Sequence, residues 1–437
     1  MSTRFPLTAA ALLFASVALA EDWPEWRGPN RDGVSQETGL LKAWPKDGPP
    51  LTWTAKNLGL GWGTPSVADG KVFGIGTRGG KDGIWAVSEK DGKELWFTPF
   101  ADPPPSKALG NQTNGPGSTP TFHKGKLYVV AHDGTLGAFD AAKGKKLWTK
   151  NYVSDFGGAV PKWGYTDSVL VDGDKLVCAP GGPKAALAAL KPDTGETIWT
   201  TDAGEVSAGP VGGQGYSSPV KATFGGVPMY VILTGAKGGL LGVSAETGKV
   251  LWQYKNTPAA GGIAQIPLPV IKGDLVWVSC SYNGGSALLQ IVPGGKDKFE
   301  VKELKAYKKP DLNNHHGGMV LVGDHVYFGH DQNKGFPVCV EFKTGEIKYK
   351  ESKMPAGGDG SVAVLYADGR LYYRYQNGVL VLIEPSPEEV KVVSSFKLPP
   401  PSEKAYPQSW PHPVIANGKL YIRDQNVMYC YNVKAKN

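Results

Sequence analysis

The sequence predicts an all-β chain folded as an eight-bladed β-propeller, with four antiparallel strands in each blade and an N-terminal strand that closes the ring. Three observations predict this class. A pattern of about 50 residues recurs along the chain, which is the period of a four-stranded blade. The 437 residues include 59 Gly, 35 Pro and 13 Trp, a composition that suits short strands and tight turns. No long segment after residue 20 has the apolar periodicity of a helix.

Each copy of the repeat begins with a short strand, a glycine-containing turn and a second strand. In the first copy, Thr64-Pro65-Ser66-Val67 precedes the turn Asp69-Gly70-Lys71. Glycine suits such hairpins because it adopts positive φ without steric cost. The eight copies are expected to start at Thr64, Thr119, Asp167, Ser218, Pro267, Gly318, Ser361 and His412.

The second half of a copy is a turn with Gly followed by a strand that ends in Leu-Trp. Its clearest form is Ala141-Ala142-Lys143-Gly144-Lys145-Lys146-Leu147-Trp148. We expect each such Trp to lie flat on the neighbouring blade, where burying it stabilises the fold by a few kcal/mol. A ligand-stacking role is the alternative, but a cofactor platform would be one Trp near the axis and not one in every repeat. The predicted blade-docking residues are Trp96, Trp148, Trp199 and Trp252.

Closure of the ring is predicted from the two ends of the repeat region. The last copy stops shortly after Tyr429, so the eighth blade lacks its outer strand. The segment Leu51-Thr52-Trp53-Thr54 precedes the first copy and resembles that missing strand. Pairing the two would remove an exposed sheet edge that invites aggregation.

The first 20 residues have the features of a secretory signal. Arg4 precedes an apolar stretch without charge, and Ala18-Leu19-Ala20 offers small residues for cleavage. An uncleaved membrane anchor is the alternative, but the stretch is short for a bilayer span. We expect a signal peptide at 1–20 cut after Ala20, an extended lead-in at 21–50, a propeller at 51–437, and a periplasmic or secreted protein.

Charge and cysteine usage restrict the possible partners and cross-links. The net charge of +7 is spread over the chain, so nucleic-acid binding is not indicated. No later segment is apolar enough to span a membrane, and we expect a monomer. Exported proteins often contain disulfides, but the cysteines fall in different predicted blades. We therefore expect buried free thiols at Cys178, Cys280, Cys339 and Cys430.

The pattern Ala-x-Asp-x-x-x-Gly-Lys-x-Leu-Trp resembles the tryptophan-docking repeat of quinoprotein alcohol dehydrogenases and of their non-enzymatic relative, the BamB-type outer-membrane assembly scaffold. The resemblance covers about residues 51–432. The lead-in from Trp23-Pro24-Glu25-Trp26-Arg27-Gly28 to Val34-Ser35 resembles that of exported bacterial PQQ-like repeat proteins. The resemblance implies the fold but not an activity, because fold does not fix function.

The predicted ligand site is the axial mouth, the end of the ring at which the loops that lead into each inner strand converge. Loops between second and third strands lie on the same face; they carry Arg78, His132, Asp133, Lys237, Tyr282, Asn283, His330, Asp331, Arg423 and Asp424. Polar and aromatic groups gather there, as in many binding sites. The candidate mouth residues are Trp62, Asn114, Tyr165, Tyr216, Gln265, His315, His316, Asp359, Trp410 and His412.

His315 and His316 make a metal site or a proton-transfer role possible. Adjacent side chains of an extended strand point in opposite directions, so both rings cannot easily bind one ion, and we predict no metal site. His132-Asp133 and His330-Asp331 are interpreted as turn residues whose Asp caps a backbone amide. The aromatic residues of the mouth could stack on a flat ligand, although narrowing the channel is the simpler interpretation.

The function predicted from these features is a protein-interaction or ligand-binding scaffold without evident catalysis, in the manner of BamB. One alternative is a quinoprotein dehydrogenase that uses PQQ and Ca²⁺, which the resemblance makes possible. That family carries adjacent cysteines over the cofactor, and no two cysteines are adjacent here. No calcium ligand or catalytic residue is therefore assigned, and no cofactor is predicted. A second alternative is a propeller that binds carbohydrate or another polymer. The expected partner is an envelope protein or a small or polymeric ligand.

Overall fold

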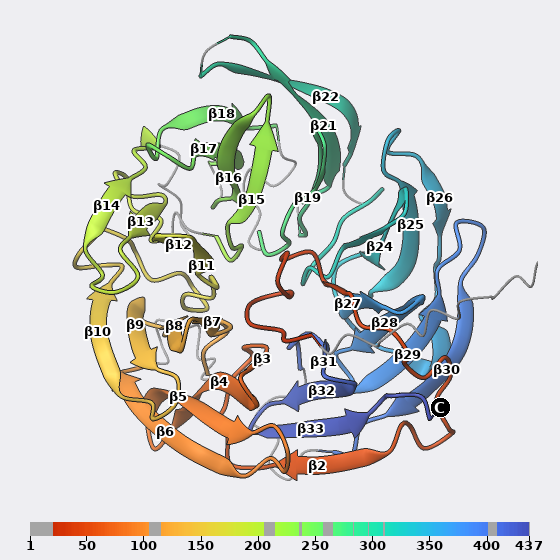
Figure 1. The fold of residues 1–437 in the computed structure, drawn as a ribbon. Coiled ribbons are helices and arrows are strands. Elements are labelled where there is room, and N and C mark those ends of the chain that lie inside the picture. The colour runs from red at the N-terminus through yellow and green to blue at the C-terminus, as the bar shows by residue number, and fades with distance from the viewer. Residues whose placement is uncertain are drawn as a thin grey trace, which may run out of the picture.

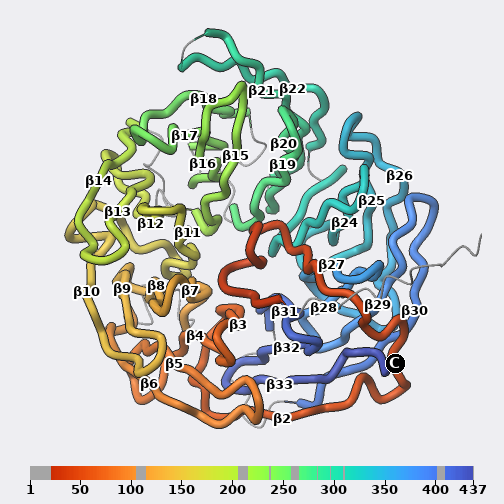
Figure 2. Tube along the Cα trace, viewed as in Figure 1, coloured from red at the N-terminus to blue at the C-terminus, as the bar shows by residue number. Residues whose placement is uncertain are grey.

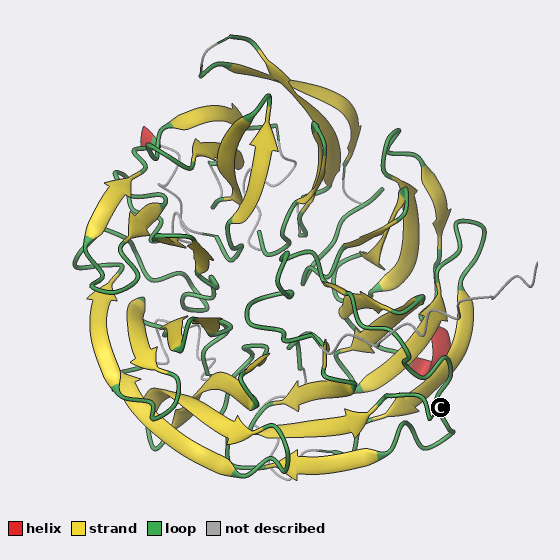
Figure 3. Cartoon of the chain, viewed as in Figure 1, coloured by secondary structure: helices red, strands yellow, loops and turns green. Residues whose placement is uncertain are grey.

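The computed structural model describes residues 21–104, 115–204, 215–235, 238–256, 265–282, 284–295, 297–308, 311–400 and 409–436. Eight antiparallel sheets stand around one axis, which confirms the predicted eight-bladed propeller (Figure 1). Almost all of the regular structure of the described residues is strand, and the short helical pieces drawn in Figure 3 include the 3-10 turn at Pro355–Gly357. None of the described segments forms an apolar helix of membrane-spanning length.

The strands of each blade follow one another outward from the axis. Blades 1 to 4 comprise β3 (Ser66–Ala68), β4 (Lys71–Arg78), β5 (Lys81–Ser88) and β6 (Glu94–Ala101); β7 (Thr121–His123), β8 (Lys126–Val130), β9 (Thr135–Asp140) and β10 (Lys146–Asn151); β11 (Leu170–Asp172), β12 (Lys175–Cys178), β13 (Ala188–Leu190) and β14 (Thr197–Thr200); and β15 (Val220–Phe224), β16 (Val227–Leu233), β17 (Leu240–Ser244) and β18 (Val250–Tyr254).

Blades 5 to 7 have the same plan, and blade 8 takes its outer strand from the N-terminal part of the chain. In order, blades 5 to 8 comprise β19 (Val270–Lys272), β20 (Leu275–Ser279), β21 (Ser286–Pro293) and β22 (Phe299–Tyr307); β23 (Val320–Val322), β24 (His325–His330), β25 (Phe336–Glu341) and β26 (Ile347–Lys350); β27 (Val362–Ala367), β28 (Arg370–Tyr375), β29 (Val379–Glu384) and β30 (Lys391–Lys397); and β31 (Val414–Ala416), β32 (Lys419–Asp424), β33 (Val427–Asn432) and β2 (Leu51–Ala55).

The turn between the first two strands of a blade explains part of the repeat signature. In blade 1, Asp69 and Gly70 have φ of 52° and 67°, as a two-residue hairpin turn of type I′ requires. The inner hairpins of the eight blades turn at Asp-Gly, Asn-Gly, Lys-Gly, Gly-Gly or Gly-Asp pairs.

Every outer strand carries a β-bulge at the same place. One residue of it has no partner in the register with the third strand, and the next residue resumes pairing. In blades 1 to 4 the residue that pairs again after the bulge is the repeat Trp. The Leu-Trp or Ile-Trp pair in the sequence is therefore a bulged residue followed by the Trp. The bulged residues are Leu95, Leu147, Ile198, Leu251, Leu304, Lys348, Val393 and Thr52.

Three of the repeat Trp residues lie over a turn glycine of the following blade. A Cβ added to Gly144 would lie 2.5 Å from the ring of Trp96, and one added to Gly248 would lie 2.5 Å from the ring of Trp199. Trp148 lies in the same way over Gly195 and donates its Nε1–H to the carbonyl of Pro192, 2.9 Å away. The turn glycine thus supplies both the positive φ and the room for the ring.

Trp252 is placed differently. It pairs with Gly242 across its own sheet, whereas Trp96, Trp148 and Trp199 each pair with an alanine. Without a methyl group at Gly242, the ring falls onto blade 4 itself and donates Nε1–H to Met229 Sδ at 3.2 Å. It still belongs to a buried cluster shared by blades 4 and 5.

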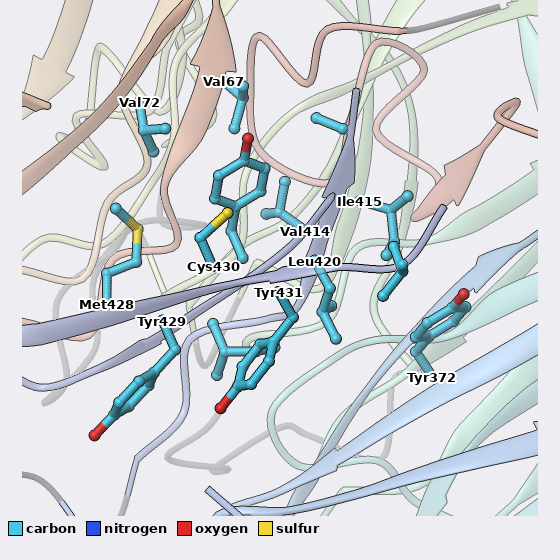
Figure 4. Close-up of a cluster of buried hydrophobic side chains, with 14 of the residues drawn as sticks. Val67, Val72, Tyr372, Val414, Ile415, Leu420, Met428, Tyr429, Cys430 and Tyr431 are labelled. Atoms are coloured by element: carbon cyan, nitrogen blue, oxygen red, sulfur yellow. The ribbon is translucent and has the colours of Figure 1, made fainter. Parts of the chain in front are cut away.

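The seam between blades 8 and 1 is closed by β2, as predicted. β2 pairs antiparallel with β33, and Trp53 covers Gly92 of blade 1 and donates to the Glu89 carbonyl at 3.0 Å. Figure 4 shows the buried cluster at this seam, in which Val67 and Val72 of blade 1 and Tyr372 of blade 7 surround side chains of blade 8. All four cysteines are buried and free.

The N-terminal lead-in does not lie outside the ring but crosses its centre (Figures 1 and 2). Trp23 bridges Val67 of blade 1, and the amide of Phe122 in blade 2 donates to the Pro24 carbonyl at 2.7 Å. The strand β1 (Val34–Ser35) then adds to blade 7 in parallel with β27. The lead-in is therefore a structural part of the propeller, pairing with edges of inner strands that face the axis.

Candidate functional site at the axial mouth

The predicted mouth residues come from different blades but from equivalent loops. In chain order, the loops before β3, β11, β15, β19, β23 and β31 carry Trp62, Tyr165, Tyr216, Gln265, the pair His315-His316, and the pair Trp410 and His412. Asp359 precedes β27 and is exposed. Asn114, Lys237 and Asn283 lie outside the described residues.

One part of the mouth is a stack of rings from blades 1, 6 and 8. The Trp410 ring lies 4.5 Å from Trp62 and 4.2 Å from His316, the latter nearly parallel at 23°. His315 continues the stack at 3.9 Å from His316 and meets Tyr282 of blade 5 edge-on at 5.1 Å. Trp62, Trp410 and His316 are each half-buried, so the stack fills one side of the mouth and leaves part of its rings to solvent.

A second group joins blades 3, 4 and 5. The Tyr216 amide donates to the Gln265 carbonyl at 3.0 Å, and the Tyr216 ring lies 5.7 Å from Trp163. Tyr165 is fully buried and donates its hydroxyl to the Pro180 carbonyl at 3.1 Å. Trp163, half-buried beneath the ammonium of Lys162, was missed in the sequence; its position two residues before Tyr165 is the signal that could have found it.

His412 links the mouth to the lead-in below it. Arg27 Nη1 lies 3.5 Å from His412 Nδ1, and His412 Nε2 lies 3.2 Å from the carbonyl of His316. Because a guanidinium can only donate, Nδ1 accepts and Nε2 carries the proton. Burial, reinforced by Arg27, lowers the pKa of His412 to about 3. Its imidazole is therefore neutral at pH 7 and held in one tautomer.

The two adjacent histidines are also held neutral. Burial lowers the pKa of His315 to about 4, and burial with the neighbouring His315 and His412 lowers the pKa of His316 well below its usual value. His315 Nδ1 lies 2.9 Å from the Ser361 hydroxyl. Unlike free imidazoles, which titrate near neutrality, these rings act as uncharged packing and hydrogen-bonding groups.

Several residues of the loops between second and third strands have structural contacts. Asp133 accepts from the Thr135 amide at 2.8 Å and Asp331 from the Gln332 amide at 2.7 Å, as expected of capping turn residues. His132 Nδ1 lies 3.1 Å from the buried carboxylate of Asp82. Arg78 pairs with Glu94 on the surface.

Arg423 is turned into the protein and not toward a ligand. Its guanidinium is fully buried and donates to the carbonyls of Gly59, Gly63, Ile75 and Gln425 at 2.7–3.1 Å. Burial lowers its pKa to about 9, so it stays charged at pH 7. It fastens the loop that leads into blade 1 to blade 8.

Two site residues of the lead-in had no assigned role in the sequence. Trp26 packs against the ring of His412 at 4.6 Å, and Arg27 contacts the same imidazole. The sequence signal was present as the Trp-Arg-Gly-Pro motif, but nothing local to the motif indicates that its partner lies 385 residues away.

The family model described as outer membrane protein assembly factor BamB matches residues 40–155 and 154–384. The chain belongs to this family. BamB of Shewanella oneidensis is 26% identical over 243 residues, covering 52% of this chain and 55% of that protein. The 1-butanol dehydrogenase (cytochrome c) of Thauera butanivorans is 26% identical over 171 residues, covering 37% and 21% respectively. The chain thus spans about half the length of the first relative and less of the second.

Solved structures show the same architecture at low identity. BamB from Moraxella catarrhalis superposes with a TM-score of 0.55 at 14% identity, covering 83% of this chain and 95% of that one. A europium-containing methanol dehydrogenase gives 0.63 at 14% identity, covering 92% and 89%. At such identities these likenesses support the fold alone.

A quinone cofactor with Ca²⁺ finds no matching donor set among the described residues of this BamB-family propeller. Ca²⁺ takes six to eight oxygen ligands, and no three His, Cys, Asp or Glu side chains in the described part of the chain converge on a metal position. Among the acidic residues in the loops that lead into inner strands, the exposed Asp359 of blade 7 and the fully buried Asp167 of blade 3 belong to different blades. We therefore derive no chemical step through such a group.

Proposed function

We propose that this chain is an extracytoplasmic scaffold that holds an envelope protein partner at its axial mouth and performs no chemistry there. The observation that carries the proposal is the pattern of groups at the mouth. Trp62, Trp163 and Trp410 are half-buried around it, while the imidazoles of His412 and His315 contact the His316 carbonyl and the Ser361 hydroxyl. Partly exposed Trp residues on a rigid frame are typical anchors of protein interfaces.

Membership of the BamB family supports a scaffold in the cell envelope, since relatives of that name are outer membrane assembly factors. The predicted signal at 1–20 fits this location. A scaffold of this kind would act as a monomeric propeller.

Photo-crosslinking from the mouth tests the scaffold in living cells. A benzophenone amino acid at position 410 should give one discrete adduct with an envelope protein, identified by mass spectrometry. The control position is Asp174, an exposed residue in the inner turn of blade 3. Trp62→Ala should then weaken the purified complex by at least 30-fold, the effect of losing an interface anchor of about 2 kcal/mol. Equal adducts at both positions, or none at 410, would contradict the proposal.

A second candidate is the oxidation of alcohols with PQQ and Ca²⁺. It is favoured by the similarity to a 1-butanol dehydrogenase. Incubation with PQQ and Ca²⁺ should then change the absorbance spectrum and allow an alcohol to reduce a dye. An unchanged spectrum would reject this candidate.

A third candidate is binding of a carbohydrate or another polymer, favoured by the same aromatic rim. Glycan-array binding that depends on Trp163 would support it. A silent array would reject it for the glycans tested and leave the protein scaffold as the better proposal.

A further inference from the structure

A cavity lies between the lead-in and the inner strands of blades 4, 5 and 6. Its volume is about 180 Å³. Because a water molecule takes up about 30 Å³ in the liquid, this is room for a ligand of roughly the size of an amino acid. Exposed residues of the lead-in and of β15 stand at its edge, so it is open to solvent. The lining residues are Arg27, Asn30, Arg31, Asp32, Val220, Lys221, Leu268, Pro269, Val270, Ile271, Met319 and Leu321.

The two walls of this cavity differ in chemistry. The lead-in supplies the guanidinium groups and the polar side chains, and β15 adds the ammonium of Lys221. The inner strands of blades 5 and 6 and the loops before them supply only apolar side chains: Leu268, Pro269, Val270, Ile271, Met319 and Leu321. A ligand that fits both walls must carry a polar head and an aliphatic body.

Arg27 is the charged group with the least compensation. It is 4% exposed and forms no ion pair with a carboxylate among the described residues. Its Nη2 donates to the carbonyls of Met319 at 2.5 Å and Asp32 at 2.8 Å. Burial lowers its pKa to about 10, which leaves it protonated at neutral pH. The Asp32 carboxylate, which accepts from the Val34 amide, offsets part of this charge.

Arg31 adds a donor that the protein does not use. Its Nη1 pairs with Glu25 at 2.7 Å, and its Nη groups donate to the carbonyls of Ser168 and Val169. Its Nε–H is buried and has no hydrogen-bond partner among the described residues. An unsatisfied buried donor is destabilising, and an anion in the cavity would relieve it. Lys221 on the opposite edge is paired with Asp172 at 2.6 Å.

We propose that this cavity binds a small aliphatic carboxylate, with its head toward Arg27 and Arg31 and its chain against blades 5 and 6. Three cationic residues and one carboxylate line the cavity, and two of the cations already have carboxylate partners. The remaining cation is Arg27, which has the Asp32 carboxylate nearby but no ion pair with it, so we place the anionic head at Arg27 and at the unused Nε–H of Arg31. This binding site adjoins the mouth through Arg27, which also contacts His412, but it does not depend on the scaffold function.

Calorimetric titration of the purified protein with 4-methylpentanoate tests the chemistry of the site. A dissociation constant of about 1 mM or tighter is expected for a ligand of this size. The control ligand is 4-methylpentan-1-ol, which has the same chain without the charge and should bind at least tenfold more weakly. No binding of the acid at 20 mM, or equal binding of the alcohol, would overturn the proposal.

Two variants test the location. Ile271→Trp fills the cavity from β19 without changing charge and should abolish binding of the acid. Val171→Trp is the matched control, because Val171 is the middle residue of β11 as Ile271 is of β19, and it does not line the cavity. Unchanged binding by Ile271→Trp would place the acid elsewhere and overturn the site.

Arg27→Met tests the anchoring charge and should weaken binding of the acid at least tenfold while leaving binding of the alcohol unchanged. Equal loss of both ligands would overturn the assigned role of the guanidinium. The melting temperature of Arg27→Met is measured in parallel, because Arg27 also donates to two backbone carbonyls. Should this variant not fold, Ile271→Trp and the pair of ligands still decide the proposal.

Discussion

The junctions among blades 1 to 4 and the seam between blades 8 and 1 use similar contacts, but the seam adds the buried guanidinium of Arg423. At the junctions a Trp that follows a bulge covers a turn glycine of the next blade, as Trp96 covers Gly144. At the seam Trp53 covers Gly92 in the same way. Both kinds of contact also have a Lys and a Tyr that reach one carboxylate: at the junction of blades 3 and 4, Lys221 and Tyr230 reach Asp172 at 2.6 and 2.8 Å. Lys419 and Tyr421 of blade 8 both reach the Glu89 carboxylate of blade 1, at 3.1 and 3.0 Å.

The difference follows from the connectivity of the chain. Blades 1 to 4 are covalently continuous, so their junctions join segments about 50 residues apart in the chain, as Lys221 and Asp172 are 49 apart. The seam joins segments more than 300 residues apart, and closing so long a loop carries an additional entropic cost. The closing strand β2 and the buried Arg423 offset it. Seam and junctions should therefore respond differently to mutation.

Removal of residues 21–55 should have the largest effect. It deletes the closing strand β2 together with the lead-in that pairs with inner-strand edges, which leaves β33 as an exposed edge. We expect the truncated protein to unfold or aggregate, measured by soluble yield and by circular dichroism on heating. Removal of Glu21 and Asp22 alone is the control and should be tolerated. An unchanged melting temperature for the long deletion would refute closure by β2.

Arg423→Met tests the polar part of the seam. It leaves the carbonyls of Gly59, Gly63 and Ile75 without their buried donor, and we expect a loss of about 3 kcal/mol in the free energy of unfolding. Arg78→Met, which removes a partly exposed surface pair with Glu94, should change stability by no more than about 0.5 kcal/mol. Denaturant unfolding measures both. Similar losses would show that the guanidinium does not hold the seam.

Gly144→Ala tests a regular junction. The added methyl group would sit 2.5 Å from Trp96 at a positive φ of 70°, so we expect destabilisation of about 2–3 kcal/mol. Gly273→Ala is matched in backbone conformation, with φ of 64°, but has no atom within 4 Å of its added Cβ. It should cost about 1 kcal/mol, so the difference isolates the Trp contact. Equal losses of the free energy of unfolding in urea would mean that the Trp96 ring moves aside for the methyl group without a measurable cost.

Acidification should destabilise the point at which lead-in, mouth and seam meet. The pKa of His412 is about 3 in the folded protein and 6.5 for a free imidazole, so the unfolded chain binds more protons between these values. The contribution of neutral His412 to the free energy of unfolding is therefore present above pH 6.5 and is lost as the pH falls. The loss is about 2 kcal/mol between pH 6.5 and 5. Arg27 and Arg374 oppose protonation, and the His316 carbonyl favours it. In His412→Gln, unfolding midpoints between pH 7 and 5 should depend less on pH; an unchanged slope would contradict this.

The predicted features that the structure confirms are those that repeat or that depend on local chemistry. The inner hairpins follow from pairs such as Asp69-Gly70, and the eight-blade count follows from the recurrence of these pairs. The closing strand could be found because Leu51–Thr54 supplies the one strand that the eighth copy lacks. The position of Trp252 could not be found from its motif, because it depends on Gly242 ten residues earlier, across the sheet.

The amino-acid sequence by itself determined the blades, their number and the end of the ring at which the mouth residues gather, since each follows from a periodic or nearest-neighbour pattern. Only the tertiary structure decided that the lead-in crosses the axis, that Arg423 faces backbone and not solvent, and that His412 stands between Arg27 and His316. These arrangements join single residues up to 385 positions apart. No repeat encodes them, because each is selected by burial and hydrogen bonding in one assembled ring.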